Sequence, residues 1–127
     1  MTKKKPIEQR IKQLAAAHPD IAVVWLYGSR ARNTATDNSD YDLAVAFKSF
    51  IKDSALDARL RPESLALDWQ QTLSTPLSVV DINLAPIPLA MTVVDDDRPL
   101  YVADIRRKMM EEQRIRSRWE HEYEIQQ

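Results

Sequence analysis

The single glycine of the sequence, Gly28, constrains this chain more than any other residue. Average usage would supply about nine glycines in a chain of this length, yet only this one is present. It directly follows the apolar run 21–27, where a strand is expected to end. Such a position predicts a positive φ or a very close approach of the backbone to another group. A Walker P-loop is excluded, because that motif requires two glycines followed by a lysine.

Three apolar segments predict β-strands. The run 21–27 is nearly continuous and rich in β-branched and aromatic residues, which is typical of a strand covered on both faces. A second strand is expected at 40–47, after a stretch of turn-forming residues, and we expect it to lie beside the first. A third strand is expected at 77–84, closed by Pro86 and Pro88.

Helical periodicity surrounds these strands. An amphipathic helix is expected from Pro6 to about His18. One or two helices are expected within 53–73, with Pro62 beginning a second helix rather than lying inside one. A long polar helix is expected over 104–127, and its apolar face is formed by Ile105, Met109, Trp119 and Tyr123. The pattern predicts an α/β fold, a small mixed β-sheet flanked by helices, in a single domain over residues 1–127.

Charge and composition exclude several classes of protein. The 18 basic and 19 acidic residues give a net charge of -1, so the chain lacks the positive field typical of nucleic-acid binders. The absence of cysteine excludes disulfides, thiolate nucleophiles and cysteine zinc sites. The apolar runs are too short to cross a bilayer, and charged residues interrupt the region where a signal peptide would be apolar. We therefore expect a cytoplasmic protein with no membrane partner and no direct nucleic-acid partner.

Two aspartates, Asp40 and Asp42, begin the second expected strand. Because side chains alternate along a strand, both project from one face, about 7 Å apart. Their mutual repulsion is relieved if a cation binds between them, and magnesium prefers such hard oxygen ligands. The alternative is a solvated turn that enters a strand, since Asn38 and Ser39 precede the pair.

The junction after the first strand offers a cradle for phosphates. Backbone N–H groups are free where a strand ends and a helical turn begins, and Gly28 lets a triphosphate approach them. The Ser29 hydroxyl adds a donor, and Arg30 or Arg32 could neutralise charge, although surface arginines are common.

Asp81 is an acidic residue within the third expected strand. A carboxylate in a segment that otherwise belongs to the core is costly unless it is paired. If its strand lies beside the second one, Asp81 could join the metal cluster and accept a proton as general base. An exposed position on an edge strand is the alternative.

The stretch from Tyr27 to Val45 resembles the signature of the DNA polymerase β-like nucleotidyltransferase superfamily: Gly-Ser, ten residues, then Asp-x-Asp. In that superfamily Gly-Ser holds the nucleotide and the aspartates bind metal. The resemblance implies metal ligation and catalysis by Asp40, Asp42 and Asp81, with two magnesium ions and ATP as substrate. It also implies nucleotide contacts from Gly28, Ser29, Arg30, Arg32 and Ser39. Asn33 stands where the family usually places glycine, and we expect it to adopt the positive φ that asparagine tolerates.

Within that superfamily the chain looks like the minimal nucleotidyltransferase antitoxins of HEPN/MNT toxin-antitoxin pairs. This resemblance implies transfer of AMP from ATP to a tyrosine of a HEPN-domain ribonuclease toxin, within a hetero-oligomeric complex. Two alternatives stay open. The first is a non-catalytic antitoxin that neutralises the toxin by binding it. The second is an adenylyltransferase for a small antibiotic, which requires a dimer because so short a chain has little material to build a pocket.

Overall fold

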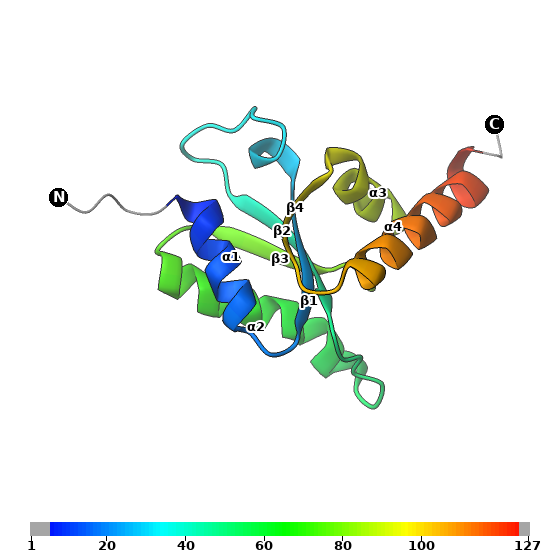
Figure 1. Cartoon of the computed structure of the whole chain (residues 1–127), viewed down its shortest axis with the longest axis horizontal. Helices are drawn as coiled ribbons and strands as arrows, with labels where there is room; N and C mark the ends of the chain where they lie inside the picture. The colour runs from blue at the N-terminus through cyan, green and yellow to red at the C-terminus, as the bar shows by residue number, and fades with distance from the viewer. Residues whose placement is uncertain (1–5, 125–127) are drawn as a thin grey trace.

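A four-stranded mixed sheet forms the centre of the protein, which is described here for residues 6–124 by a computed structural model (Figure 1). Four helices and two short helical turns surround it. The elements in chain order are α1 (Ile7–Ala17), β1 (Ile21–Tyr27), the 3-10 turn η1 (Gly28–Arg30), β2 (Tyr41–Phe47), α2 (Ala55–Leu73), β3 (Leu77–Asp81), α3 (Ile87–Asp96), β4 (Arg98–Val102), α4 (Ile105–Trp119) and the π-helical turn η2 (Glu120–Glu124). The expected α/β fold with a small mixed sheet is therefore confirmed. Residues 1–5 and 125–127 lie outside the described residues, and so does the end of the long helix expected over 104–127.

The sheet order is β3-β2-β1-β4, with β1 antiparallel to β2 and β4 and with β2 parallel to β3. Every residue of β1 is buried, as its continuous apolar sequence predicts. One face of the sheet packs on α1 and α2, and the other packs on α3 and α4 (Figure 1). Trp69 of α2 belongs to the first core, and Val93 of α3 and Ile115 of α4 belong to the second. Two helical layers thus hold β1 and β2 rigidly in the middle.

Helix α2 differs from the expectation that Pro62 begins a second helix. It runs without a break from Ala55 to Leu73, with Pro62 inside it and buried. Proline removes one backbone hydrogen bond from a helix interior. Burial of its ring against the sheet offsets part of that cost. The start of the single helix is fixed by Ser54, whose hydroxyl oxygen accepts the N–H of Asp57 at 3.1 Å.

The segment after β3 is more regular than its sequence indicates. The third strand ends at Asp81 rather than at residue 84. The residues that follow form helix α3, which has prolines only around its first turn, and strand β4. Proline fits the first turn of a helix, so Pro86 and Pro88 start this one rather than merely closing the strand before it. Asp97, at φ 50°, ends α3 and directs the chain into β4.

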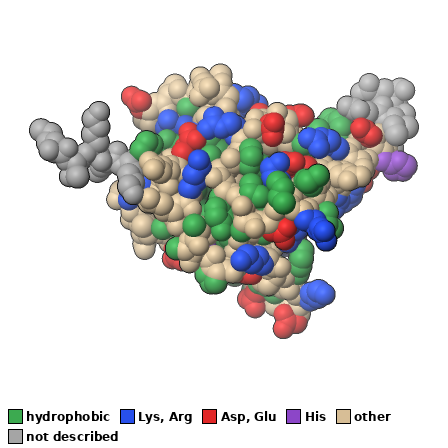
Figure 2. Space-filling model, in the orientation of Figure 1, with side chains coloured by type: hydrophobic (Ala, Val, Ile, Leu, Met, Phe, Trp, Pro, Cys, Tyr) green, Lys and Arg blue, Asp and Glu red, His purple; other side chains and the backbone are tan. Residues whose placement is uncertain are grey.

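Helix α4 buries a different face from the expected one. Ile105 and Met109 are exposed, whereas Ile115 is buried together with Glu111 and Glu112. Burial of two carboxylates is possible because each is paired: Glu112 accepts a hydrogen bond from the Trp25 indole at 3.2 Å. No helix among residues 6–124 is long and apolar enough to cross a membrane. Figure 2 shows positive and negative side chains mixed on the face in view.

Candidate active site

Gly28 turns the chain sharply at the end of β1. Its φ is +79°, and a Cβ atom at this position would lie only 2.7 Å from Oδ2 of Asp42. The close approach follows from the register, which places Tyr27 opposite Asp42 in the antiparallel pair of β1 and β2. The prediction that the only glycine has a positive φ or a close backbone approach is therefore confirmed, and both properties are present.

The Asp42 carboxylate is held from two sides. Ser78 of β3 donates its hydroxyl to Oδ1 at 2.8 Å, and the glycine turn lies against Oδ2. Asp42 is half-buried, while Asp40 lies just before β2 and is exposed. The fixed carboxylate, Asp42, thus lies at the Gly28 turn, and the exposed one, Asp40, stands two residues before it in the chain.

The pKa of Tyr27 depends on the charge of this site. Its pKa is raised to about 12, chiefly by burial and next by the negative charge of Asp42, while a hydrogen bond with Ser78 acts to lower it. An unfolded tyrosine ionises near pH 10. The folded protein therefore holds this proton more tightly, and its free energy of unfolding falls as the pH rises from about 10 to about 12.

Replacement of Asp42 with asparagine is expected to lower the pKa of Tyr27, because it removes the negative charge that opposes ionisation. The measurement is a pH titration of tyrosinate absorbance, with Tyr27→Phe identifying which transition belongs to this residue. An unchanged Tyr27 transition in Asp42→Asn would show that the carboxylate does not face the hydroxyl. This test requires neither nucleotide nor partner.

The loop between β1 and β2 uses several residues that the sequence assigned to the nucleotide. Arg30 donates to the backbone oxygen of Ser39 at 2.9 Å and stacks over the Tyr41 ring, 4.5 Å from its centroid. The Ser39 hydroxyl accepts the N–H of Thr36 at 2.9 Å. Arg30 and Ser39 therefore close the loop on itself. Asn33 has a φ of 59°, as predicted for the position where the superfamily has glycine.

Two other predicted residues remain available for a ligand. The Ser29 hydroxyl has no hydrogen-bond partner within residues 6–124. Arg32 is largely exposed and lies 3.8 Å from the Asp96 carboxylate. The N–H of Gly28 itself is not free, because it donates to Asp96 at 2.8 Å. Fewer groups are thus free to bind phosphates at this junction than the sequence predicted.

Asp81 does not lie with Asp40 and Asp42, and its predicted place in the metal cluster is corrected. Strand β3 does neighbour β2, but the register pairs Ser78 with Asp42 and Asp81 with Val45. Three residues along a strand separate Ser78 from Asp81 by about 10 Å and turn their side chains to opposite faces. Asp81 therefore points to the α2 side, away from Gly28.

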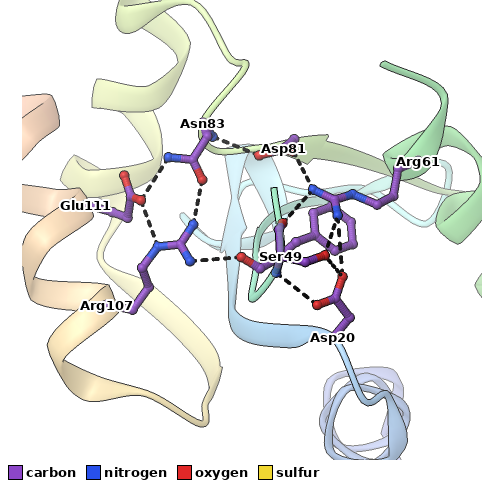
Figure 3. A network of polar contacts seen from close by, with 8 residues as sticks. Asp20, Ser49, Arg61, Asp81, Asn83, Arg107 and Glu111 are labelled. Carbon is purple, nitrogen blue, oxygen red and sulfur yellow. Dashed lines mark hydrogen bonds and ion pairs between the residues drawn. The ribbon is translucent and has the colours of Figure 1, made fainter. Parts of the chain in front are cut away.

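Asp81 instead belongs to a polar network at the other end of the strands (Figure 3). Its carboxylate lies 3.6 Å from the Arg61 guanidinium and accepts the N–H of Asn83 at 2.9 Å. Arg61 also contacts Asp20 and Ser49, and Asn83 contacts Arg107 and Glu111. This network ties α2 and α4 to the ends of β2 and β3.

Burial raises the pKa of Glu111 in this network, but its hydrogen bonds with Asn83, Arg107 and Arg114 outweigh the effect of burial and leave that pKa below its ordinary value.

Replacement of Asp81 with asparagine is expected to lower the free energy of unfolding by about 1–3 kcal/mol, because it leaves the partly buried Arg61 with one fewer anionic partner. Any activity measured well below the melting temperature should stay within about threefold of wild type, since Asp81 lies outside the site. Chemical denaturation measures the first effect. Loss of activity without loss of stability would return Asp81 to the catalytic group.

Comparison with known proteins identifies the family of the chain. The sequence model of the family described as polymerase beta, nucleotidyltransferase matches residues 9–106. The chain belongs to the polymerase beta nucleotidyltransferase family. The matched range contains the Gly28 turn, Asp40, Asp42 and α3, so the family assignment covers the whole candidate site. No curated protein sequence matches the chain.

Solved structures share the fold of this nucleotidyltransferase. A toxin-antitoxin crystal structure with AMP-PNP matches it with a TM-score of 0.71 and 24% identity, covering 92% of this chain and 89% of the other. A toxin-antitoxin structure named MntA-HepT matches with 0.67 and 21%, covering 91% and 86%. A tri-AMPylated Shewanella oneidensis HEPN toxin in complex with MNT antitoxin matches with 0.67 and 22%, covering 91% and 85%. At these identities the likeness establishes the fold.

The nucleotidyltransferase site can be tested for its fit to a divalent cation. Within residues 6–124 no three histidine or acidic side chains converge on one point, so the expected three-carboxylate cluster is absent there. Asp40 and Asp42 remain, and magnesium usually takes only one or two protein carboxylates beside water and phosphate. At the glycine turn the Asp42 carboxylate occupies the space that a Cβ atom would need. These two side chains fit the role of metal ligands.

Two residues of this site escaped the sequence reasoning. Ser78 stands where a third carboxylate would face Asp42, and Asp96 holds the Gly28 N–H. Neither has a local signal in the sequence, because serine is common in strands and Asp96 is the middle of an ordinary-looking acidic run. Only the pairing of β2 with β3 and the packing of α3 bring them to the site.

Proposed function

We propose that this nucleotidyltransferase is an antitoxin that transfers AMP from ATP to a tyrosine of a HEPN-domain toxin and thereby inactivates it. The observation that carries the proposal is the contact of the Gly28 turn with a fixed Asp42 carboxylate inside the family's sequence signature. The fold shared with a toxin-antitoxin structure with AMP-PNP, and with an MNT antitoxin in complex with a tri-AMPylated HEPN toxin, supports the choice of nucleotide and acceptor. We place the reaction in the cytoplasm, where ATP is available.

In this proposal Asp40 and Asp42 hold magnesium, which supplies charge neutralisation on the phosphates when it is bound. The triphosphate binds to the Ser29 hydroxyl and to the backbone of the Gly28 turn. Arg32 contacts it from the solvent side. The tyrosine oxygen forms a bond to the α-phosphorus while the bond to the β-phosphate oxygen breaks, and pyrophosphate leaves. The tyrosine proton passes to solvent, which reaches the site at the exposed Asp40.

The direct test uses the purified protein with ATP, Mg²⁺ and the toxin encoded beside it. Intact mass spectrometry of the toxin should show the gain of one or more AMP masses, and fragment spectra should place them on tyrosine. Omission of Mg²⁺ should remove the gain. An unmodified toxin after incubation with active protein would contradict the proposal.

A second candidate is neutralisation by occlusion, in which the protein binds the toxin without transferring AMP. The observation that favours it is the exposed apolar side of α4, where Ile105, Met109 and Met110 are each about 60% exposed. Occlusion predicts that Asp40→Asn still neutralises the toxin in cells and still co-purifies with it. AMP transfer predicts that this variant binds the toxin but leaves the cells poisoned.

A further inference from the structure

Asp96 is the last residue of α3, and its side chain is buried. Only 7% of the side chain is exposed. Its Oδ2 accepts the backbone N–H of Gly28 at 2.8 Å, and its Oδ1 lies 3.8 Å from the Arg32 guanidinium. The flanking residues Asp95 and Asp97 are exposed. Of this acidic run, one member therefore contacts the candidate site.

The position of Asp96 is unfavourable without those contacts. The C-terminal end of a helix carries partial negative charge, which repels a carboxylate. Removal of the carboxylate from water adds a further cost unless hydrogen bonds replace the solvent. The Gly28 N–H supplies a well-formed bond, whereas the Arg32 contact is long and largely exposed. The bond to Gly28 is thus the interaction that holds Asp96 in place.

Gly28 in turn contacts two carboxylates. Asp96 holds its N–H, and the Asp42 carboxylate fills the space where a Cβ would stand. Glycine moves between positive and negative φ more readily than any other residue, so a turn built on it needs an external restraint. A change of the Gly28 peptide plane would move the contact with Asp42 and redirect the N–H groups of the residues that follow.

We propose that Asp96 is a positioning residue that locks the Gly28 turn in the conformation that admits Asp42 and the nucleotide. It acts through a backbone hydrogen bond and touches neither substrate nor metal. The effect on rate rests on the proposed AMP transfer, whereas the effect on the Gly28 N–H does not. The two can therefore be measured separately.

The sequence makes this test unusually clean, because Gly28 is the only glycine. Labelling with ¹⁵N-glycine gives one backbone amide signal from Gly28 in an NMR correlation spectrum, and its hydrogen-exchange rate reports the bond to Asp96 directly. Asp96→Ala should shift this signal and speed its exchange by about tenfold or more. Asp96→Asn retains a carbonyl oxygen that accepts the same N–H, so exchange should stay near wild type. Arg32→Ala should leave the exchange slow.

The transfer rate should follow the same order. Asp96→Ala should lower kcat for AMP transfer by about 10–100-fold, with Asp96→Asn restoring most of it and the exposed control Asp95→Ala unchanged. If Asp96→Ala does not fold, Asp96→Ser replaces it, since its shorter side chain cannot span the bond. An unshifted, slowly exchanging Gly28 signal in Asp96→Ala overturns the proposal, as does a shifted signal with an unchanged kcat. If wild type transfers no AMP, the function fails and the Gly28 signal still decides whether Asp96 holds the turn.

Discussion

Replacement of Asp42 with asparagine is expected to lower the rate of AMP transfer by about a thousandfold or more. The substitution keeps the shape of the side chain and its hydrogen bond from Ser78, but removes the charge that attracts a divalent cation. Folding should be little affected, because half-buried Asp42 has no cationic partner among residues 6–124. The measurement is the initial rate of AMP incorporation into the toxin at saturating ATP.

The matched control for this variant is Asp37→Asn. Asp37 is an exposed carboxylate in the loop that precedes β2 and carries the same charge, but it is one of the ten spacer residues of the signature and belongs to neither Gly-Ser nor Asp-x-Asp. Its substitution should leave the rate within about twofold of wild type, which separates a local effect from a change in net charge. Equal losses in the two variants would contradict a metal-binding role for Asp42.

Replacement of Gly28 with alanine is expected to abolish detectable transfer and to destabilise the fold by about 1–3 kcal/mol. Two effects add here. An L-residue at φ +79° is strained, and the new Cβ would stand 2.7 Å from Oδ2 of Asp42 and force that carboxylate aside. Thermal unfolding measures the first effect, and the transfer rate at a temperature where the variant is folded measures the second.

Asn33→Gly is the control for backbone strain in the same loop. Asn33 also has a positive φ, 59°, but glycine adopts this conformation freely and adds no atoms. We expect a change in stability below about 1 kcal/mol and an unchanged transfer rate. A Gly28→Ala variant that retains full activity would show that the glycine turn does not set the position of Asp42.

The features that the sequence predicted well depend on local requirements. An isolated glycine at the end of a continuous apolar strand has few explanations, so its positive φ and its close approach were predictable. Asn33 follows the same logic, since few residues tolerate the left-handed region. The continuous apolar character of 21–27 likewise predicted a strand buried on both faces.

The role of Asp81 could not be predicted, because it depends on register. The metal role was conditional on its strand lying beside the second one, which it does, but a local pattern does not say which residues of two strands stand opposite each other. Here Val45 pairs with Asp81, and a serine faces Asp42 instead. The same limit applies to Asp96, which reaches Gly28 across 68 positions of sequence through the packing of α3.

The helices of the second half of the chain show how tertiary context overrides local signals. Proline fits the first turn of a helix better than its interior, so Pro62 predicted a helix start, yet it lies buried within α2. The spacing of Ile105, Met109, Trp119 and Tyr123 predicted an apolar face on the last helix, whereas the buried face of α4 carries Glu111 and Glu112. Paired carboxylates can enter a core, but their partners come from other elements and leave no periodic pattern in the sequence.

The central claim is that the nucleotide and its metal bind at the Gly28 turn, with Asp40 and Asp42 and without Asp81. The most direct measurement is a crystal structure with Mn²⁺ and a non-hydrolysable ATP analogue, in which anomalous scattering locates the metal. We expect the Mn²⁺ peak beside the carboxylates of Asp40 and Asp42, with the triphosphate against Ser29. A peak at Asp81, or a nucleotide bound away from Gly28, would contradict this account.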